Sequence, residues 1–354
     1  MNSLNKYFPV SKEIPIDKFI SNALYDQDYG YYSKKIPFGK NGDFITSPSI
    51  SPLFSEMIAL WIVAFWEHLG KPKIFNIIEL GPGSGQMCAT LINVFKKFPT
   101  FLKAANIFLY EKSKTLKNLQ KKNLNYKRIN WINHFSKIKK GPVIFFGNEF
   151  FDSIPIKQYK KINNILYEKY VKLGDNSKII ISFKKADLKS IKELKKYNLL
   201  KKKSFIEFPK QGLNELNLII KTIKKLNGGL LLVDYGFLKQ QNKNTLQSLK
   251  DHKKNTLFKN IGNADITSLV NFELLVKYLG EKKLQLNDVV TQEFFLKKMG
   301  IIDRAEIVSK KMNFREKSAL YMRLQRLLNP KQMGKLFRVI SAFKLKNKPL
   351  LGFV

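Results

Sequence analysis

A glycine-rich turn beside an acidic residue is the stretch of this chain best suited to chemistry. Residues 75–87 read FNIIELGPGSGQM, so an apolar, β-favouring run ends at Glu79 and three glycines follow closely. The residues after the turn carry apolar side chains at helical spacing. Strand, glycine turn and helix together indicate the opening of a nucleotide-type α/β domain, in which a ligand comes close to bare backbone.

Three classes of ligand use such a turn. A phosphate-binding loop needs a Lys-Ser/Thr pair after the last glycine, and none follows Gly85. A dinucleotide fold expects glycine where Gln86 stands, and a ribose acid nearer than Glu111. S-adenosylmethionine carries an ammonium and a sulfonium instead of a pyrophosphate, so Glu79 favours it. Glu111, which ends the second predicted strand, is then placed to accept hydrogen bonds from both ribose hydroxyls. The glycine pattern alone remains weak support for this choice.

A second acidic cluster follows the fourth predicted strand, residues 141–146. The stretch NEFFD at 148–152 places Glu149 and Asp152 three residues apart with two phenylalanines between them. Carboxylates beside aromatic rings suit a cationic, planar substrate such as a guanidinium. A carboxylate could also help to remove the proton that prevents a guanidinium from acting as a nucleophile. The structural alternative is that Asp152 caps the next helix and that the phenylalanines belong to the core.

The elements that must position these residues alternate along the chain. Strands are predicted at 75–79, 106–111, 129–132, 141–146 and 228–236, with helices at 16–25, 52–65, 113–122 and 214–226 between or before them. Strands that alternate with helices indicate a parallel sheet. Residues 157–210 break this alternation and are predicted to form an inserted β-rich lobe. Asn133, directly after the third strand, is a further candidate for the cofactor site.

Composition excludes several other classes of function. The net charge is +37, but only six of the 64 basic residues are arginines. Proteins that bind nucleic acids specifically favour the forked guanidinium of arginine, so we expect no specific nucleic-acid binding. Cys88 is the single cysteine and the three histidines are scattered, so neither a disulfide nor a metal site is expected. The longest apolar run, residues 57–66, is about half the ~20 residues of a membrane span.

We therefore expect a protein of a reducing compartment. The N-terminal residues show neither an apolar signal core nor an arginine-rich presequence. The bacterial cytoplasm is the simpler expectation and the mitochondrial matrix the alternative. The oligomeric state stays open, with a homodimer as one option.

Eleven short motifs in order along the chain carry a resemblance to a known family. They are DYGYY with PFG and GDFITSP, LFSEMIALW, ELGPGSG, EKSKTLKNLQ, NEFFDSIPI, LLVDYG, ADITSLVNF, TQEFFLKKMGI and NPKQMGKLF, between about residues 15 and 340. This set resembles the MidA-type family of S-adenosylmethionine-dependent protein-arginine methyltransferases, which is related to the mitochondrial complex I assembly factor. GDFITSP together with NEFFDSIP is the most specific part.

The resemblance implies a class I, Rossmann-like methyltransferase sheet, S-adenosylmethionine as cofactor, and symmetric dimethylation of an arginine in a complex I subunit. It adds Gly42, Asp43 and Thr46 to the cofactor site, where Gly81 and Gly83 join the two acids already named. Glu149 and Asp152 then lie on the substrate side as catalytic candidates. The implied division is 1–72 as a helical segment with a cofactor-covering loop, 73–156 and 211–240 as the methyltransferase core, 157–210 as the lobe, and 241–354 as a helical substrate-side region with terminal strands.

One position departs from the family pattern. The family usually has GPGRG, whereas this chain has Ser84 in place of the arginine. A missing cation beside the methionine carboxylate would weaken donor binding. The competing hypothesis is therefore a catalytically weak or inactive assembly chaperone that keeps the methyltransferase fold.

Overall fold

A nine-stranded, mostly parallel sheet forms the centre of the molecule in the computed structural model, which describes residues 4–8, 13–37, 46–174, 178–201, 204–239, 241–345 and 351–354. Its strands are β2 (Phe75–Leu80), β3 (Ala105–Tyr110), β4 (Ile129–Ile132), β5 (Val143–Asn148), β10 (Gly228–Phe237), β14 (Val270–Asn271), β15 (Gln285–Leu286), β16 (Val290–Thr291) and β17 (Phe337–Lys344). The order is β15-β17-β10-β5-β2-β3-β4, with β14 beside β10 and β16 beside β17. β17 runs antiparallel to β10, whereas β4, β3, β2, β5 and β10 are parallel.

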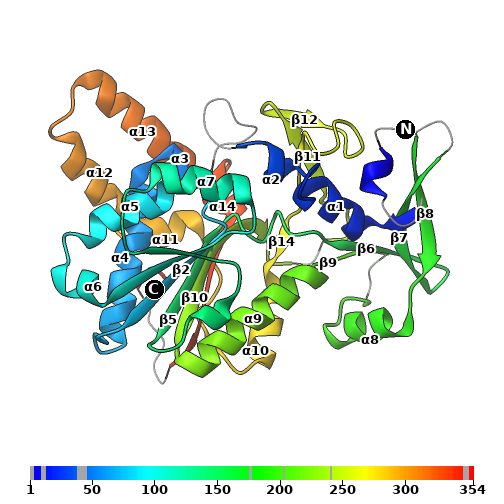
Figure 1. Ribbon diagram of the computed structural model, residues 1–354, viewed down its shortest axis with the longest axis horizontal. Coiled ribbons are helices and arrows are strands. Elements are labelled where there is room, and N and C mark those ends of the chain that lie inside the picture. The colour runs from blue at the N-terminus through cyan, green and yellow to red at the C-terminus, as the bar shows by residue number, and fades with distance from the viewer. Residues whose placement is uncertain are drawn as a thin grey trace.

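Helices cover both faces of this sheet (Figure 1). The helices of the described residues are α1 (Ile16–Tyr25), α2 (Tyr31–Lys34), α3 (Ser47–Ile50), α4 (Pro52–His68), α5 (Gln86–Phe95), α6 (Pro99–Ala104), α7 (Lys114–Asn123), α8 (Leu188–Lys196), α9 (Lys210–Leu226), α10 (Phe272–Glu281), α11 (Gln292–Lys298), α12 (Ile301–Ser309), α13 (Phe314–Leu328) and α14 (Met333–Leu336). α4 begins as the sequence predicts, because the Ser51 side chain accepts a hydrogen bond from the Leu53 N–H and proline occupies the first turn.

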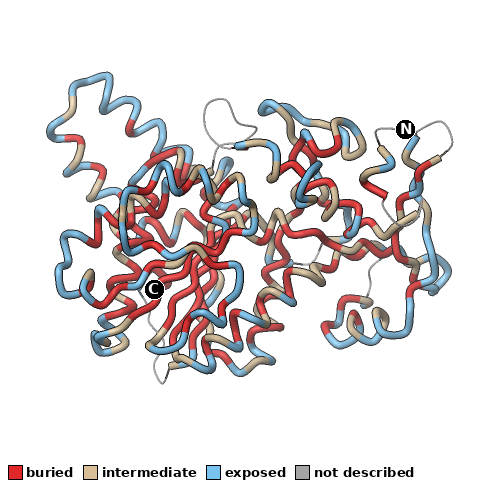
Figure 2. The backbone as a smooth tube through the Cα atoms, in the orientation of Figure 1, coloured by how far each residue is buried: buried red, intermediate tan, exposed pale blue. Residues whose placement is uncertain are grey.

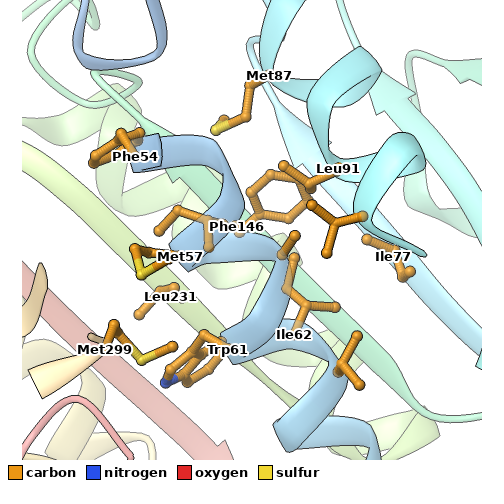
Figure 3. Packing of buried hydrophobic residues seen from close by; sticks show 14 of the residues in the cluster. Phe54, Met57, Trp61, Ile62, Ile77, Met87, Leu91, Phe146, Leu231 and Met299 are labelled. Atoms are coloured by element: carbon orange, nitrogen blue, oxygen red, sulfur yellow. The ribbon is translucent and has the colours of Figure 1, made fainter. Parts of the chain in front are cut away.

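Alternate strand residues divide the core into two clusters. Ile77, Phe146 and Leu231 pack with α4 and α5 on one face, whereas Ile78 and Phe145 pack with α9 and α10 on the other. Figure 3 shows the first cluster, in which side chains of α4 and α5 meet over the sheet. Because the strands are covered on both faces, most of their residues are apolar, which is why they can be recognised from sequence.

The inserted stretch forms a second, antiparallel sheet at the end of the molecule opposite the α12–α13 pair (Figure 1). Its strands are β6 (Lys157–Ile162), β7 (Ile165–Leu173), β8 (Ile179–Lys185) and β9 (Phe205–Phe208), and β7 and β8 form an antiparallel pair. The N-terminal β1 (Glu13–Pro15) also pairs with β7, a long-range contact that the sequence does not signal.

Residues 242–265, which are polar and weakly patterned, contribute to a small sheet. It consists of β11 (Gln247–Lys250), β12 (Lys253–Asn255) and β13 (Asp265–Thr267). Ile266 of this sheet packs with α1 and with Val171 of β7 in a third buried cluster. Figure 2 shows that the strands at the centre of the molecule are buried along most of their length. A strand was also expected near the C-terminus, and β17 confirms it, while residues 351–354 form a turn. No helix within the described ranges has the length and apolarity needed to cross a membrane.

Candidate functional site

The strand order reverses between β2 and β5, because the chain runs from β2 outward to β3 and β4 and then returns to β5 on the other side. In open α/β sheets, ligands bind outside the carboxyl ends of the strands at such a switch point. A cavity of about 840 Å³ lies there. Its walls include the ends of β2, β3 and β5, together with residues of α1, α3, α13 and the small β11–β13 sheet.

The glycine turn after β2 has the backbone that its sequence demands. Gly81, Gly83 and Gly85 have φ values of 61°, 55° and 82°, in the left-handed region that favours glycine. A Cβ atom at Gly81 would lie 3.0 Å from a ring carbon of Phe150, so a side chain there would crowd the substrate-side loop. Gly81 and Gly83 line the cavity, and bare backbone is therefore presented to a ligand.

Glu79, at the end of β2, is an uncompensated acid in the cavity wall. The residue is 2% exposed, and its Oε2 has no hydrogen-bond partner within the described structure. Burial, with a smaller contribution from the Glu111 charge, raises the pKa of Glu79 to about 8. A buried carboxyl oxygen without a partner is costly, and a cationic ligand group would both compensate the charge of Glu79 and hydrogen-bond that oxygen. The ammonium of S-adenosylmethionine fits this requirement.

Glu111 follows β3 and is held to the glycine turn by one side chain. Its Oε1 accepts the Ser113 N–H at 2.8 Å, and its Oε2 accepts Gln120 Nε2 at 3.1 Å. Gln120 Nε2 also donates to the Gly83 carbonyl at 2.8 Å, and its Oε1 accepts Trp131 Nε1 at 3.0 Å. Burial raises the pKa of Glu111, although these hydrogen bonds act in the opposite direction. Gln120 thus fixes the spacing between the acid and the turn.

Glu149 begins the loop after β5 in a conformation unusual for a residue with a side chain. Its φ is 54°, in the left-handed region. Its Oε1 accepts Asn148 Nδ2 at 2.8 Å and the Ser47 N–H of α3 at 3.2 Å. The Ser47 hydroxyl donates to Gln292 Oε1, so α3 and α11 support this arrangement. Removal from water raises the pKa of Glu149 to about 7, close to the range of a general base.

Asp152 lies on the same wall beside other acids. Removal from water and the neighbouring charges of Asp234 and Glu149 hold the pKa of Asp152 well above its usual range. Asp265, which is 3% exposed, accepts a hydrogen bond from the Tyr32 hydroxyl at 3.1 Å. The Tyr32 ring stacks on Tyr25 at 5.3 Å between centroids, and both rings line the cavity. Carboxylates and aromatic rings therefore share one chamber.

The structure brings together most of the residues selected from sequence. Thr46, Glu79, Gly81, Gly83, Glu111, Glu149 and Asp152 all line this cavity. Gly42 and Asp43 lie outside the described residues. Asn133 is exposed and does not line the cavity, because it follows β4 at the sheet edge, two strands away from β2.

Several residues of the site were not selected from sequence. Three of them line the cavity, namely Tyr25, Tyr32 and Asp265, and Tyr32 is hydrogen-bonded to Asp265. The other two hydrogen-bond acids of the cavity wall: Ser47 binds Glu149 and Gln120 binds Glu111. Four of them fall within motifs of the resemblance, namely Tyr32 in DYGYY, Ser47 in GDFITSP, Gln120 in EKSKTLKNLQ and Asp265 in ADITSLVNF. Those motifs were the available signal, but a motif does not say which residues meet in the fold. Within the described part of the chain, no cluster of His, Cys, Asp and Glu side chains has an arrangement that could hold a metal ion.

The sheet order, the glycine turn and the acids at the ends of β2 and β3 define a Rossmann-like fold built for S-adenosylmethionine. The chain belongs to a family of S-adenosyl-L-methionine-dependent methyltransferases, whose model matches residues 57–290. It is accordingly a methyltransferase, and S-adenosylmethionine is its cofactor. The resemblance seen in the sequence is confirmed.

Two named relatives and one solved structure with a similar fold support this placement. The chain is 31% identical to the mitochondrial protein arginine methyltransferase NDUFAF7 homolog of Caenorhabditis elegans, over 78% of this chain and 70% of that protein. It is 28% identical to the human mitochondrial protein arginine methyltransferase NDUFAF7, over 93% and 79% respectively. A protein from Burkholderia thailandensis, whose crystal structure contains bound S-adenosyl-homocysteine, has the same fold with a TM-score of 0.83 at 21% identity, covering 97% of this chain and 90% of that one.

Proposed function

We propose that this chain transfers methyl groups from S-adenosylmethionine to an arginine side chain of a protein. The observation that carries the proposal is the chamber beside the donor site, in which Glu149, Asp152 and Asp265 adjoin the rings of Tyr25 and Phe150. A guanidinium is planar and cationic, so a carboxylate can bind it through two parallel hydrogen bonds and aromatic ring faces can stabilise its charge. The relatives named as protein arginine methyltransferases support the same substrate class.

The donor side is proposed to use Glu79 for the ammonium, Glu111 for the ribose hydroxyls, and the bare backbone of Gly81 and Gly83 for close approach. Thr46 lines the same cavity, and Thr46, Gly42 and Asp43 are retained as proposed cofactor contacts. S-adenosylmethionine supplies a methyl group that its sulfonium has already activated. The protein must then mainly position the acceptor nitrogen and exclude water.

Glu149 is proposed to take the proton that the attacking guanidinium nitrogen must lose. A protonated guanidinium is not nucleophilic, so a nearby carboxylate must localise its charge away from that nitrogen and accept a proton. Two N–H groups, from Ser47 and Asn148, bind the Oε1 atom of Glu149 and orient the carboxylate. Asp152 is proposed to hold the guanidinium from the neighbouring position.

We further propose that the acceptor lies in a subunit of respiratory complex I and is dimethylated symmetrically. The resemblance of the motifs to the family related to the complex I assembly factor supports this substrate. The compartment is proposed to be the bacterial cytoplasm, with the mitochondrial matrix as the alternative, which the word mitochondrial in the relatives' names supports. The inactive-chaperone alternative would rest on Ser84 alone.

The test incubates the purified protein with radiolabelled S-adenosylmethionine and protein extract from cells that lack it, followed by amino-acid analysis of the labelled product. Labelled methylarginine is expected, and its absence despite donor binding would overturn the proposal. Glu149→Gln should bind the donor within about threefold of the wild type but lose transfer by roughly 10²-fold or more, since a general base contributes 10²–10⁴-fold. Undiminished transfer by this variant would refute the role given to Glu149.

A further inference from the structure

Asp234 is a buried acid that neither the donor site nor the substrate chamber uses directly. It lies near the end of β10, is 2% exposed, and does not line the cavity. The parallel register pairs Val233 with Asn148, so Asp234 stands beside the loop that begins at Glu149. A buried carboxylate needs compensation by hydrogen bonds or charges, and the structure shows where Asp234 obtains it.

Several backbone N–H groups converge on this one carboxylate. Phe151 N donates to Oδ2 at 2.8 Å, and Tyr235 N donates to Oδ1 at 2.8 Å. The Asp152 backbone N–H also donates to the Asp234 carboxylate. Asp234 therefore binds its own strand and the far end of the loop after β5 at the same time.

The near end of that loop is tied to the same strand. Glu149 N donates to the Val233 carbonyl at 2.9 Å, which extends the β5–β10 pairing by one residue. Between the two attachments, Glu149 adopts the left-handed φ of 54° that side chains disfavour. A loop with such a residue keeps its shape only where its surroundings impose it, and Asp234 supplies the anchoring at Phe151 and Asp152.

We propose that Asp234 is a positioning residue for methyl transfer, which holds the loop 149–152 so that Glu149 and Asp152 face the substrate. The role in methyl transfer rests on the proposed function, whereas the anchoring of the loop by Asp234 does not. A carboxylate is required because both oxygens accept N–H groups. An asparagine offers one accepting oxygen, and its NH₂ group would face a backbone N–H.

The proximity of three acids supports the same role. Asp234 and Glu149 are both charged neighbours of Asp152, and together with its removal from water they raise the pKa of Asp152. Burial and the charge of Glu149 raise the pKa of Asp234 to about 7. The fold thus keeps three acidic side chains close together although their negative charges repel one another. The need to hold the loop 149–152 in one shape accounts for this unfavourable arrangement.

The test compares Asp234→Asn with Glu207→Gln in the full-length protein. Glu207 is a matched control, because its carboxylate also accepts a backbone N–H, that of Thr245 at 2.9 Å, but lies in the lobe sheet away from the cavity. For Asp234→Asn we expect donor affinity within about threefold of the wild type, while kcat for the methylarginine-forming reaction falls by about 10²-fold, as expected from a misplacement near 1 Å. The control should keep kcat within about threefold.

A second measurement does not depend on activity. Amide hydrogen exchange should accelerate at Phe151 and Asp152 in Asp234→Asn and stay unchanged there in Glu207→Gln. Unchanged exchange at these amides, or a kcat within threefold of the wild type, would overturn the inference. An equal loss of donor affinity and kcat would also overturn it, because it would indicate general damage. If the wild type makes no methylarginine, the proposed function fails, and the exchange result still decides whether Asp234 holds the loop.

Discussion

Replacing Glu79 by glutamine should stabilise the ligand-free protein and weaken donor binding. Glu79 is 2% exposed, one of its oxygens has no partner within the described structure, and burial raises its pKa from the ordinary 4.5 to about 8. A raised pKa in the folded state means that stability is complete below the unfolded pKa and is lost as the pH rises towards the folded one. The wild type should therefore lose stability between about pH 4.5 and pH 8 through this group.

The magnitude follows from linkage. At pH 7 the unfolded carboxyl is ionised and the folded one is mostly protonated, which corresponds to about 2.5 pKa units at ~1.4 kcal/mol each, or up to about 3.5 kcal/mol. Glutamine has nearly the same shape as the protonated acid and does not ionise. The variant should thus exceed the wild type in free energy of unfolding by about 1–3 kcal/mol at pH 7 and by about zero at pH 4.

Denaturant unfolding at several pH values measures this difference, and calorimetry measures donor affinity in parallel. Loss of the charge-assisted contact should weaken S-adenosylmethionine binding by about 1.5–3 kcal/mol. Donor binding to the wild type at pH 7 should release a proton, because an ammonium favours the ionised carboxylate. Glu67→Gln, at an exposed ion pair on α4, serves as a control that changes neither quantity greatly. A variant less stable than the wild type at pH 7, or equal donor affinity, would refute this reasoning.

Two further substitutions test the support of the donor site. Gln120→Leu removes the link between Glu111 and the Gly83 carbonyl and leaves Trp131 Nε1 without its acceptor. Donor affinity should therefore fall about tenfold, and the free energy of unfolding should fall by about 1–3 kcal/mol. Asn118→Leu, at an exposed position of the same helix, is the control, and an equal loss in that variant would contradict the role given to Gln120. Ser84→Arg restores the family cation on the cavity wall and should tighten donor binding about threefold to tenfold in a salt-sensitive way, with Ser84→Ala for comparison. Equal affinity in both would mean that this position does not affect donor binding.

Local features of the site were predictable because their causes are local. The β2 strand, the glycine turn and the start of α4 each follow from a few adjacent residues, and all are confirmed. The carboxyl ends of parallel strands meet at one edge, so Glu79, Glu111 and Glu149 could be expected together. The same reasoning selected Asn133 without regard to strand order. This residue follows the edge strand β4 and does not line the cavity, so its role in cofactor binding stays a prediction.

What the sequence could not supply are contacts between distant segments. Ser47 reaches Glu149 across 102 positions, and Tyr32 reaches Asp265 across 233. Neither pair has a periodicity or turn signal, because a single hydrogen bond places almost no demand on its neighbours in sequence. Asp234 is the instructive intermediate case. Its position at the end of a buried strand is visible from sequence, but the convergence of Phe151 and Asp152 on it requires the register of β5 and β10.

The overall charge of the chain and the charge of its cavity point in opposite directions. The chain carries +37, whereas the cavity wall contains more acids than bases, with Lys112 already paired to Glu215. Surface charges are screened within about 8–10 Å at physiological salt, but charges removed from water are screened much less. A cationic group inside the chamber therefore interacts mainly with the nearby carboxylates. The lysine excess consequently gives no reason to infer an anionic ligand, and the local arrangement of acids outweighs composition as a guide to the substrate.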